Sequence, residues 1–393
     1  MKILYHHRTA SRDGQSTHIT EMINALRANG HSVVECAPAV DAESAQASAD
    51  GGSPGWVGKL KAHLPRGLYE LAELAYSLVA YRRLAKAIRA ERPDGIYERY
   101  NLYMLAGVWA SRRFRLPLIL EVNAPMAVER QQYGGLSWPR LAAGLERYVW
   151  RRAHRILPVT QVLAESLQEE GVQPGRIRVI PNAINEEHYL SLPDTETAKA
   201  GLGLQGRLVI GFTGFVREWD RLDRIVTWMA QAKDHPQVHL LVVGDGPARA
   251  EIEDCARKLG VADRVSFTGV VPREAVPSLA MAFDIALQTA LVPYASPLCL
   301  FEYLRLGKAI VAPDQPNHHE LLTHELNAEL YPPDDPAGIE RALDRLCADA
   351  ALRERIARAA PGVIVEKQLT WPDHARQVVI LFESLRGRSL ETA

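Results

Sequence analysis

The apolar, helix-like beginning of "SPLCLFEYLRLGKAIVAPD", residues 296–314, contains one carboxylate, Glu302. The helix that we expect to start near Ser296 would direct the N–H groups of Leu298 and Cys299 toward an anion. Glu302, one to two turns inside, would then accept from two vicinal hydroxyls. The arrangement suits a diphosphate on the helix end and a ribose on Glu302. A core or surface role for this glutamate remains the alternative.

Two loops that follow expected strands also carry residues suited to anions. In "RTASRDGQSTHI", Gly14 lies just before a helix that we expect to begin near Thr17, and a glycine there lets backbone N–H groups approach an anion closely. A simple strand-to-helix turn explains this glycine equally well. In "GFTGFVREWDRLD", Arg217 presents a guanidinium suited to a phosphate. The alternative for Arg217 is a surface ion pair.

Patterns typical of other chemistries are missing from the sequence. No G-x-G-x-x-G follows the first expected strand, which argues against an NAD-dependent dehydrogenase. No D-x-D stands next to a strand end, and no set of side chains has the spacing of metal ligands. His6–His7 and His318–His319 are adjacent pairs whose side chains should diverge, so solvated or core roles are favoured. We therefore expect neither a metal nor a bound cofactor.

Length and composition favour two domains in a reducing compartment. A chain of 393 residues, 47% of them hydrophobic, is too long for one ordinary core. The net charge of −1 is unevenly distributed, because residues 1–190 carry 24 Lys and Arg against 19 Asp and Glu, which leaves 22 against 28 for the rest. The four cysteines have no paired spacing and are interpreted as core thiols.

Short strand-like segments alternate with helical ones, which indicates α/β domains with parallel sheets. The first half has six expected strands: Lys2–His7, His31–Pro38, Gly95–Tyr100, Leu116–Asn123, Arg155–Thr160 and Ile177–Ile184. The second half also has six: Arg207–Gly214, Val238–Gly246, Arg264–Gly269, Ile285–Thr289, Ala309–Pro313 and Asn327–Pro332.

This alternation places one doubly wound domain at residues 1–190 and a second at 191–373. A last helix, 374–390, has an apolar face of its own and is expected to pack back on the first domain. The Ser, Ala, Asp and Gly-rich stretch 41–55 is expected to be a mobile loop. Because ligands bind at the carboxyl ends of parallel strands, two such sheets facing across a cleft would hold two substrates.

The basic bias is strongest in Trp56–Arg115, with 12 basic residues against 5 acidic ones. Within it, Trp56–Arg92 combines a helical apolar stripe with basic residues, a pattern that fits the surface of an anionic membrane. A core helix with a solvated basic face is the alternative. No apolar segment is long enough for a spanning helix, and the amino terminus has no secretory leader. The sequence predicts a cytoplasmic protein, soluble or peripheral on the inner face of the membrane.

Several strings together resemble the family-four retaining glycosyltransferases. They are "SPLCLFEYLRLGKAIVAPDQPNHHELL", "RVIPNAIN", "VVGDGPARAEIEDCARKLGVADRVSFTGVVPREAVPSLAMAFDIAL" and the "TW" before the last helix. "ERYN" at Glu98 and "EVNAP" at Glu121 are similar to a subgroup concerned with cell-surface polysaccharides. The resemblance implies the GT-B fold, an α/β architecture of two doubly wound, Rossmann-like domains facing across a cleft, with acceptor on the first domain and donor on the second.

The resemblance also implies roles for individual residues. Glu302 would be the second glutamate of the family's E-x7-E motif and bind the donor ribose. Val270 and Val271 would flank the base, and Tyr294 and Pro297 would lie on the side of the donor sugar. The diphosphate would be bound by Gly14, Arg217, Ser296, Leu298 and Cys299.

The sequence departs from the family pattern at three places. Tyr294 stands where the first motif glutamate belongs, so the usual contact to the donor sugar is altered. Phe215 and Asp220 replace the usual arginine and lysine after the first strand of the second domain, which leaves Arg217 or Arg221 as the nearby cation. Where many relatives carry a histidine after the fourth strand, this chain has "EVNAP", so Glu121 and Asn123 are expected to line the acceptor side.

The implied activity is a metal-independent transfer of a hexosyl group from a nucleoside-diphosphate sugar to a hydroxyl of a lipid-linked or glycan acceptor. Arg217, Glu302, Asn123 and Glu121 are the expected catalytic set, and no nucleic acid is involved. The family's retaining outcome requires no side-chain base, because the departing phosphate takes the proton. Two alternatives remain: a nucleotide-sugar epimerase of the same fold, and a non-catalytic binding protein, which the substitutions at Tyr294, Phe215 and Asp220 make plausible.

Overall fold

The computed structural model describes residues 1–9, 14–38, 65–232 and 234–391. The chain divides into two compact units. The first unit consists of Met1–Asn182, Tyr294–Ser296 and Trp371–Ala393, and the second consists of Ala183–Pro293 and Pro297–Thr370. The expected mobile loop, residues 41–55, lies outside the described residues. The expected boundary lay at residue 190. That the first domain binds the acceptor and the second binds the donor stays a prediction.

The first unit is built on a parallel sheet with the strand order β2-β1-β3-β4-β5. Its five strands are β1 (Lys2–His6), β2 (Ser32–Cys36), β3 (Gly95–Arg99), β4 (Leu118–Val122) and β5 (Arg155–Pro158). The central strands β3 and β4 are buried at every position, as expected of a sheet that is covered on both faces.

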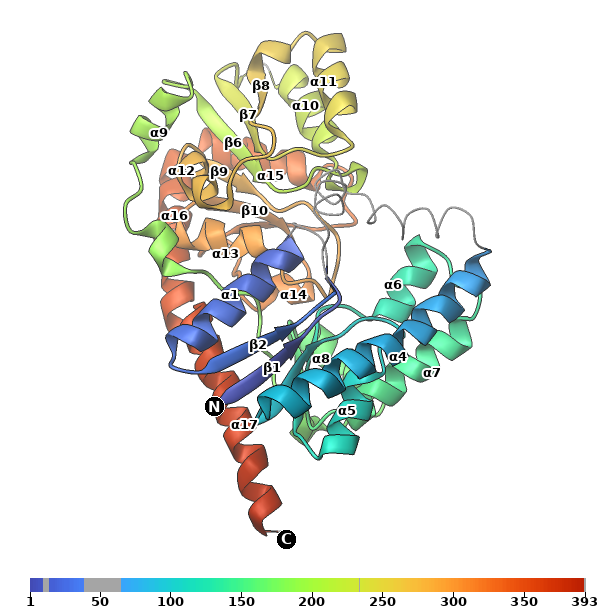
Figure 1. Ribbon diagram of the computed structural model, residues 1–393. Helices are drawn as coiled ribbons and strands as arrows, with labels where there is room; N and C mark the ends of the chain where they lie inside the picture. Colours follow the sequence, from blue (N-terminus) through green and yellow to red (C-terminus); the bar gives the residue numbers. More distant parts are fainter. Residues whose placement is uncertain (10–13, 39–64, 233, 392–393) are drawn as a thin grey trace. The chain divides into compact units, whose positions relative to one another are not determined.

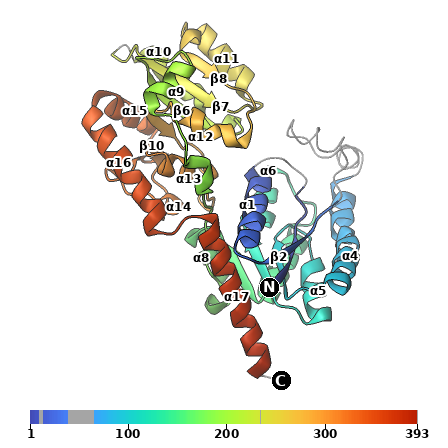
Figure 2. The same ribbon diagram turned by 60° about the vertical axis from the view of Figure 1, so that its left-hand side comes forward.

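Helices cover both faces of this sheet (Figure 1). They are α1 (Gly14–Ala28), α4 (Arg66–Glu91), α5 (Ala106–Phe114), α6 (Met126–Tyr133), α7 (Pro139–Arg152), α8 (Gln161–Glu169) and α17 (Trp371–Glu391). On one face, Leu84 of α4 and Val149 of α7 share a core with Leu120 of β4. The last helix, α17, packs along α1 (Figure 2). A Cβ atom on Gly95 would lie 2.5 Å from Phe382 of α17, so the missing side chain lets α17 approach β3.

The second unit has a parallel sheet with the order β11-β10-β9-β6-β7-β8. Its strands are β6 (Leu208–Thr213), β7 (Val238–Val243), β8 (Val265–Phe267), β9 (Ile285–Leu287), β10 (Ala309–Pro313) and β11 (Glu329–Tyr331). Its helices are α9 (Thr195–Gly201), α10 (Leu222–Gln231), α11 (Arg249–Lys258), α12 (Val276–Ala280), α13 (Leu298–Arg305), α14 (Pro316–His319), α15 (Gly338–Ala348) and α16 (Ala350–Glu366). Short 3₁₀ turns occur in both units: η1 (Pro174–Arg176) in the first, and η2 (Glu186–Tyr189), η3 (Glu218–Asp220), η4 (Ala262–Arg264) and η5 (Arg273–Ala275) in the second.

Eleven of the twelve expected strands are present, most with trimmed ends, and one expectation was wrong. The stretch Ile177–Ile184 is not a strand and forms only isolated bridges, Ile156 to Ile177 and Ile184 to Thr370. It begins beside β5, where the Ile180 N–H donates to the Pro158 carbonyl at 3.0 Å. The ladder then stops, because the next N–H group on that side, from Asn182, donates instead to the Ser296 hydroxyl oxygen at 3.1 Å. The first sheet therefore has five strands among the described residues.

Two loops at the carboxyl edge of the second sheet approach each other closely. Gly244 follows β7 with φ at +148°, and a Cβ atom there would lie 2.0 Å from the carbonyl oxygen of Gly214, which follows β6. The Val216 N–H also donates to the Asp245 carbonyl at 2.9 Å. Glycine is required at 244 because any side chain would collide with the neighbouring backbone. These contacts fix the loop that carries Arg217.

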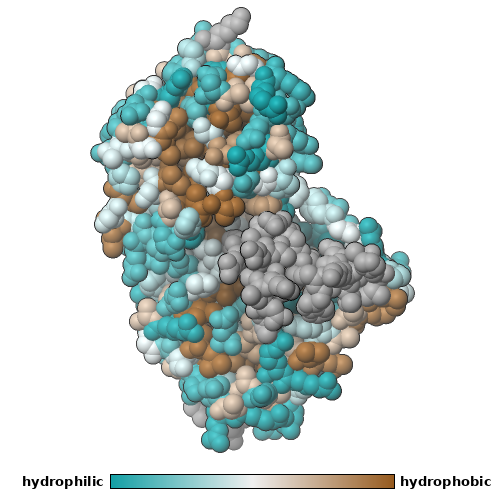
Figure 3. Space-filling model, turned by 45° about the horizontal axis from the view of Figure 1, so that its top comes forward, coloured by the Kyte–Doolittle hydropathy of each residue, from teal (hydrophilic) through white to brown (hydrophobic). Residues whose placement is uncertain are grey.

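Within the described residues, no helix is both long enough and apolar enough to cross a membrane. Figure 3 shows separate hydrophobic patches among hydrophilic surface on the face that it draws.

Candidate functional site

Helix α13 is fixed against the second sheet by its buried side. Five of its eight residues are buried: Leu300, Phe301, Glu302, Tyr303 and Leu304. The Tyr303 hydroxyl accepts a hydrogen bond of 2.7 Å from the N–H of Thr213, the last residue of β6. The helix is therefore held to the carboxyl end of a strand, where ligands bind in folds of this kind.

Glu302 is a buried charge with unused hydrogen-bonding capacity. Its side chain is 2% exposed and forms an ion pair with Arg273 of η5. Apart from this ion pair, neither carboxylate oxygen accepts a hydrogen bond from the described residues. A buried carboxylate offers about four acceptor positions, and leaving them empty is costly. Glu302 is therefore not a solvated position, and its carboxylate has acceptor positions that the described residues do not fill.

Leu298 and Cys299 are the first two residues of α13, directly after the N-cap residue Pro297. The first N–H groups of a helix have no partner inside the helix and favour anions. The Cys299 thiol contacts the Gln288 side-chain oxygen at 3.3 Å, and burial raises its pKa to about 12. The thiol therefore stays protonated, and what this residue offers an anion is its backbone N–H.

The loop after β6 contains an exposed cation, Arg217, and a buried carboxylate, Asp220. The exposed Arg217 guanidinium lies 5.1 Å from the ring centre of Phe215 and 4.9 Å from that of Trp219. None of the ion pairs among the described residues includes Arg217. Asp220 accepts from the Arg217 backbone N–H at 2.8 Å, so it caps this loop. Arg221 is instead paired with Asp223 at 3.2 Å.

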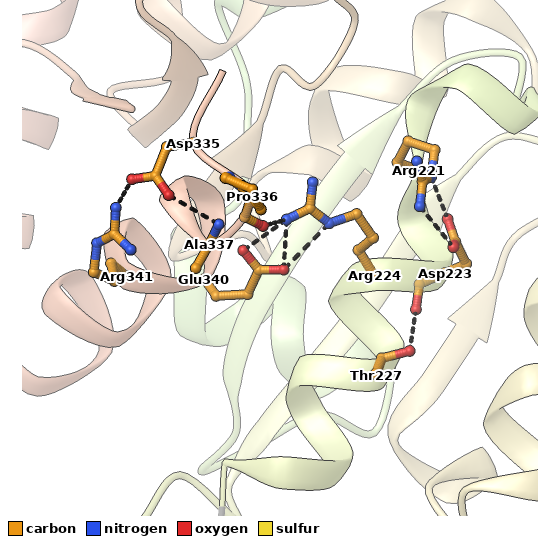
Figure 4. A network of polar contacts seen from close by, with 9 residues as sticks. All are labelled: Arg221, Asp223, Arg224, Thr227, Asp335, Pro336, Ala337, Glu340 and Arg341. Carbon is orange, nitrogen blue, oxygen red and sulfur yellow. Dashed lines mark hydrogen bonds and ion pairs between the residues drawn. The ribbon is translucent and has the colours of Figure 1, made fainter. Parts of the chain in front are cut away.

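A polar network beside this loop joins two helices of the second unit (Figure 4). Arg224 of α10 forms an ion pair of 2.7 Å with Glu340 of α15 and also donates to the Pro336 carbonyl. The Thr227 hydroxyl donates to the Asp223 carbonyl at 2.9 Å. These contacts occupy Arg221 and Arg224, so Arg217 is the cation of this loop without a carboxylate partner among the described residues.

The remaining residues expected at the donor site fall in both units. Val271 is partly buried against the core of the second unit, whereas Val270 is 80% exposed. Tyr294 and Ser296 belong to the first unit, where the Tyr294 carbonyl accepts from the Thr160 hydroxyl at 3.0 Å. Burial, Glu129 and Tyr133 raise the pKa of the Tyr294 phenol to about 12. Gly14 is the first residue of α1, so that helix begins three residues earlier than expected.

Glu121 is the centre of a buried network in the first unit. One carboxylate oxygen is paired with Arg99 and accepts from the Asn123 amide at 2.7 Å. The other accepts from the Tyr97 hydroxyl at 2.8 Å and lies 3.1 Å from Nε2 of His18. The His18 and Arg99 charges hold the pKa of Glu121 well below its usual range, against the opposing effect of burial. This carboxylate is saturated by the protein.

The network continues from His18 to the segment that precedes α13. Nδ1 of His18 lies 2.8 Å from the side-chain oxygen of Asn182. The Asn182 amide nitrogen donates to the Ser296 carbonyl, and its backbone N–H donates to the Ser296 hydroxyl oxygen at 3.1 Å. Because that amide nitrogen is engaged, the Asn182 oxygen is the acceptor for His18. Ser296, expected at the diphosphate, is thus connected to Glu121 within the first unit.

A pocket of about 410 Å³ opens at the carboxyl edge of the first sheet. Its lining comes from the ends of β1 and β3 and from α4 and α6: Arg8, Glu73, Asn101, Leu102, Met126, Glu129, Arg130 and Tyr133. Glu73 pairs with Arg130 at 2.5 Å and with Arg8 at 3.4 Å. Such a mixture of charges and an amide suits a polyhydroxylated molecule. Glu121 and Asn123 do not line this pocket.

Sequence reasoning missed His18, Arg99, Asn182 and Arg273. Each stands inside or next to a string that was singled out, namely "STHI", "ERYN", "IPNAIN" and "VVPREAV". Their partners lie far away in sequence, as His18 and Asn182 are 164 residues apart. Spacing along the chain does not show such a contact, because the fold creates it.

The adjacent histidines contact separate partners. Nδ1 of His6 lies 2.5 Å from Glu98, and Nε2 of His7 lies 3.0 Å from Glu35. His318 Nδ1 lies 2.8 Å from the Pro313 carbonyl, and His319 pairs with Asp314. In the described part of the chain, no three or more His, Cys, Asp or Glu side chains are grouped so that they could hold a metal ion.

Two family models match consecutive parts of the chain. Residues 12–188 match Glycosyltransferase Family 4, and residues 194–363 match Glycosyl transferases group 1. The chain is 30% identical over 247 residues to a 2-deoxystreptamine N-acetyl-D-glucosaminyltransferase of Streptomyces fradiae and 32% identical over 200 residues to a 2-deoxystreptamine glucosyltransferase of Streptomyces kanamyceticus. These alignments cover 57% and 47% of this chain and 57% and 49% of the relatives.

Solved structures share the two-unit architecture over nearly the whole chain. Anabaena HepE, solved in complex with UDP, superposes with a TM-score of 0.76 at 20% identity, covering 98% of this chain and all of that one. WaaG, a glycosyltransferase involved in lipopolysaccharide biosynthesis, gives a TM-score of 0.70 at 16% identity, with 96% and 99% covered. The fold is thus GT-B, and the matches favour a glycosyltransferase over an epimerase or a non-catalytic binding protein.

Proposed function

Since this chain belongs to the family-four glycosyltransferases of GT-B fold, we propose that it transfers a hexosyl group from a nucleoside-diphosphate sugar to a hydroxyl of a lipid-linked or glycan acceptor, with retention of configuration. A lipopolysaccharide core glycosyltransferase of Rhizobium meliloti is 30% identical over 146 residues, which supports such an acceptor. HepE has been solved with UDP and with UDP-glucose, so a uridine donor is the first to test.

The observation that carries this proposal is the state of Glu302. It is buried at the carboxyl edge of the second sheet, it is paired with Arg273, and its oxygens otherwise accept nothing from the described residues. A ribose presents two vicinal hydroxyls that donate to such a carboxylate. The N–H groups of Leu298 and Cys299 at the start of the same helix are then the natural partners of the diphosphate.

The proposed reaction uses electrostatics rather than a side-chain base. The bond between the anomeric carbon and the diphosphate oxygen breaks, and the acceptor oxygen bonds to the same face of that carbon. The proton of the acceptor hydroxyl passes to the departing phosphate oxygen. Arg217 and the start of α13 stabilise the negative charge that develops on the diphosphate. Neither a metal nor another cofactor is part of this proposal.

The acceptor is proposed to bind at the carboxyl edge of the first sheet. The pocket there carries both signs of charge, with Arg8 and Arg130 beside Glu73 and Glu129. Glu121 and Asn123 belong to the polar network of the same unit, and Glu121 is already saturated. Its proposed part is therefore to orient Asn123 and His18. Tyr294 and Pro297 remain the residues proposed to flank the donor sugar.

Calorimetric titration with UDP, GDP and ADP tests the donor side. Wild type is expected to bind one nucleoside diphosphate, and Glu302→Gln is expected to weaken it by about 2–3 kcal/mol, as two hydrogen bonds to a charged group are weakened. Glu340→Gln, which alters a carboxylate paired with Arg224 in the same unit, is the matched control. Binding that is unaffected by Glu302→Gln, or absent for every nucleotide, would contradict the proposed donor site.

Peripheral membrane association is a second proposal, supported by one face of α4. Leu68, Leu71, Leu78 and Val79 are about half exposed, and Arg82, Lys86 and Arg89 continue the same face as exposed cations. Apolar residues next to cations fit the surface of an anionic bilayer, at about 1 kcal/mol for each cation. Lys59 and Lys61, also in the predicted segment, lie outside the described residues.

Flotation with vesicles containing acidic lipid tests this second proposal. Wild type is expected to float with them, and the triple variant Arg82→Gln, Lys86→Gln and Arg89→Gln is expected to remain in solution. Equal flotation of both proteins, or no flotation of either, would contradict it. The matched control changes three cations elsewhere, Arg257→Gln, Lys258→Gln and Arg358→Gln, all of them exposed.

A further inference from the structure

A second concave site lies at the opposite edge of the first sheet, away from the carboxyl ends of its strands. It has a volume of about 690 Å³ and lies where α5 and α7 end and where β4 and β5 begin. Its lining contains six arginines and one histidine and no Asp or Glu: Ser111, Arg112, Arg115, Leu116, Pro117, Arg151, Arg152, Ala153, His154, Arg155, Arg176 and Leu385.

The arginines are held in place by uncharged partners. Arg151 Nε donates to the Glu170 carbonyl at 2.8 Å, and Arg176 donates to the Arg151 carbonyl at 3.1 Å. Arg112 donates to the Tyr148 hydroxyl at 3.3 Å, and Arg152 lies 5.5 Å from the centre of the same ring. None of these four arginines takes part in an ion pair with a described carboxylate. Carbonyl and aromatic partners orient guanidinium groups without neutralising them.

The dipoles of the neighbouring helices offset only a small part of the positive charge of these arginines. Arg112 and Arg152 stand in the last turns of α5 and α7, where cations are favourable. Each helix end carries roughly half a negative charge, so the two ends together offset about one of the six positive charges. Most of the positive charge of Arg112, Arg151, Arg152 and Arg176 therefore remains, concentrated around one cavity. Solvation of ordinary surface arginines does not require that they converge on a cavity.

His154 reports the positive field of this site. Its Nδ1 accepts from the Leu118 N–H at 3.1 Å, which leaves Nε2 to carry the hydrogen of the neutral ring. Burial, Arg176 and Arg155 lower the pKa of this histidine. An anion bound among the arginines would act in the opposite direction, because it stabilises the imidazolium.

We propose that this arginine-lined cavity binds a soluble ligand that carries two or more phosphate groups. Guanidinium groups bind phosphate oxygens in pairs, and several of them around one cavity match a cluster of phosphates. A soluble ligand is favoured over a bilayer because the cations surround a hollow. Leu68, Leu71, Leu78 and Val79, an exposed apolar group that a bilayer would contact, lie on α4 instead, and no exposed large hydrophobic residue is among those that line this cavity. The site is separate from the proposed donor and acceptor sites.

Calorimetric titration of the whole chain with tripolyphosphate tests the site, in excess UDP so that the proposed donor site is occupied. Wild type is expected to bind one tripolyphosphate, with an affinity that falls as salt is added. The variant Arg112→Gln/Arg152→Gln, which changes two exposed residues, is expected to bind about tenfold more weakly or worse. Arg140→Gln/Arg358→Gln removes the same charge elsewhere and is expected to bind like wild type.

A spectroscopic measurement localises the bound ligand. In NMR spectra of the protein with isotope-labelled histidines, the ring signals of His154 are expected to shift when tripolyphosphate is added. The pKa of His154 is expected to rise at the same time. Vesicles of phosphatidylglycerol are the second arm and are expected to leave these signals unchanged. The proposal is overturned if wild type does not bind tripolyphosphate, if the two double variants bind alike, if His154 does not respond, or if only the vesicles perturb it.

Discussion

Two buried glutamates at the carboxyl edges of the two sheets have opposite environments. The Glu121 carboxylate in the first unit contacts polar groups of four side chains, those of His18, Tyr97, Arg99 and Asn123. Glu302 in the second unit has the ion pair with Arg273 and no hydrogen bond from the described residues. Both side chains are 2% exposed, so burial alone does not distinguish them.

The difference lies in how many acceptor positions the protein itself fills. A saturated carboxylate stabilises the fold and orients its neighbours, whereas one with empty positions pays a desolvation cost that a ligand relieves. We therefore propose a positioning role for Glu121 and a ligand-binding role for Glu302. The comparison makes separate predictions for stability and for binding.

The largest expected effect is the loss of stability in Glu121→Ala. Removing this carboxylate leaves the Arg99 guanidinium, itself 6% exposed, buried without its charge partner. Breaking a buried pair in this way costs about 3–5 kcal/mol. Glu302→Ala is expected to lose less than half as much free energy of unfolding, because its partner Arg273 is partly exposed. Urea denaturation of Glu121→Ala and Glu302→Ala measures both losses. Equal losses in the two variants would show that the two environments do not differ.

The next effect sharpens the comparison with a third buried glutamate, Glu146 of α7. Burial raises its pKa to about 7, in spite of the Ala127 N–H that donates to it at 3.2 Å. Because the pKa of Glu146 is higher in the folded chain than in the unfolded chain, where it is near 4.5, its contribution to stability is complete below pH 4.5. This contribution is lost as the pH rises through 7. The lowered pKa of Glu121 has the opposite sign, so its stabilisation is present above the unfolded value and is lost as pH falls toward the folded pKa.

Denaturation between pH 4 and pH 8 tests both signs. Glu146→Gln is expected to gain stability relative to wild type as pH rises from 4.5 to 7, by about 3 kcal/mol in total. The deficit of Glu121→Gln is expected to be constant above pH 5 and to shrink in acid. A deficit in Glu121→Gln that grows in acid, or a pH-independent difference for Glu146→Gln, would be inconsistent with these environments.

Much of the fold was predictable from the alternation of strand-like and helical segments. Eleven strands followed from apolar, β-branched segments between helical ones, because burial on both faces leaves that pattern in a parallel sheet. The segment Ile177–Ile184 has the same composition, yet its pairing with β5 ends where the Asn182 N–H donates to the Ser296 hydroxyl instead. The membership of Tyr294–Ser296 in the first unit was not predictable, because contacts with residues such as Thr160 and Asn182 determine it.

The candidate site was predictable where one segment carries it. Glu302, Leu298 and Cys299 stand on a single helix, so spacing alone placed them together. Arg217 followed from the loop after one strand. Arg273 and His18 were missed because their partners come from distant segments, and the saturation of Glu121 depends on four side chains from two elements and a loop. Such networks are properties of the folded chain.

The smallest expected effect concerns the coupling between Glu302 and Arg273. A double-mutant cycle of Glu302→Gln and Arg273→Gln measures their coupling in the free energy of unfolding. This coupling energy should be about 1 kcal/mol, because water screens a partly exposed guanidinium. Saturating nucleoside diphosphate is expected to reduce this coupling, since ribose hydroxyls then donate to the same oxygens. The pair Arg224 and Glu340, 2.7 Å apart in the same unit, is the control whose coupling should not respond. A Glu302–Arg273 coupling unchanged by nucleotide would mean that this carboxylate is saturated in the same sense as Glu121, and the contrast between the two glutamates would then disappear.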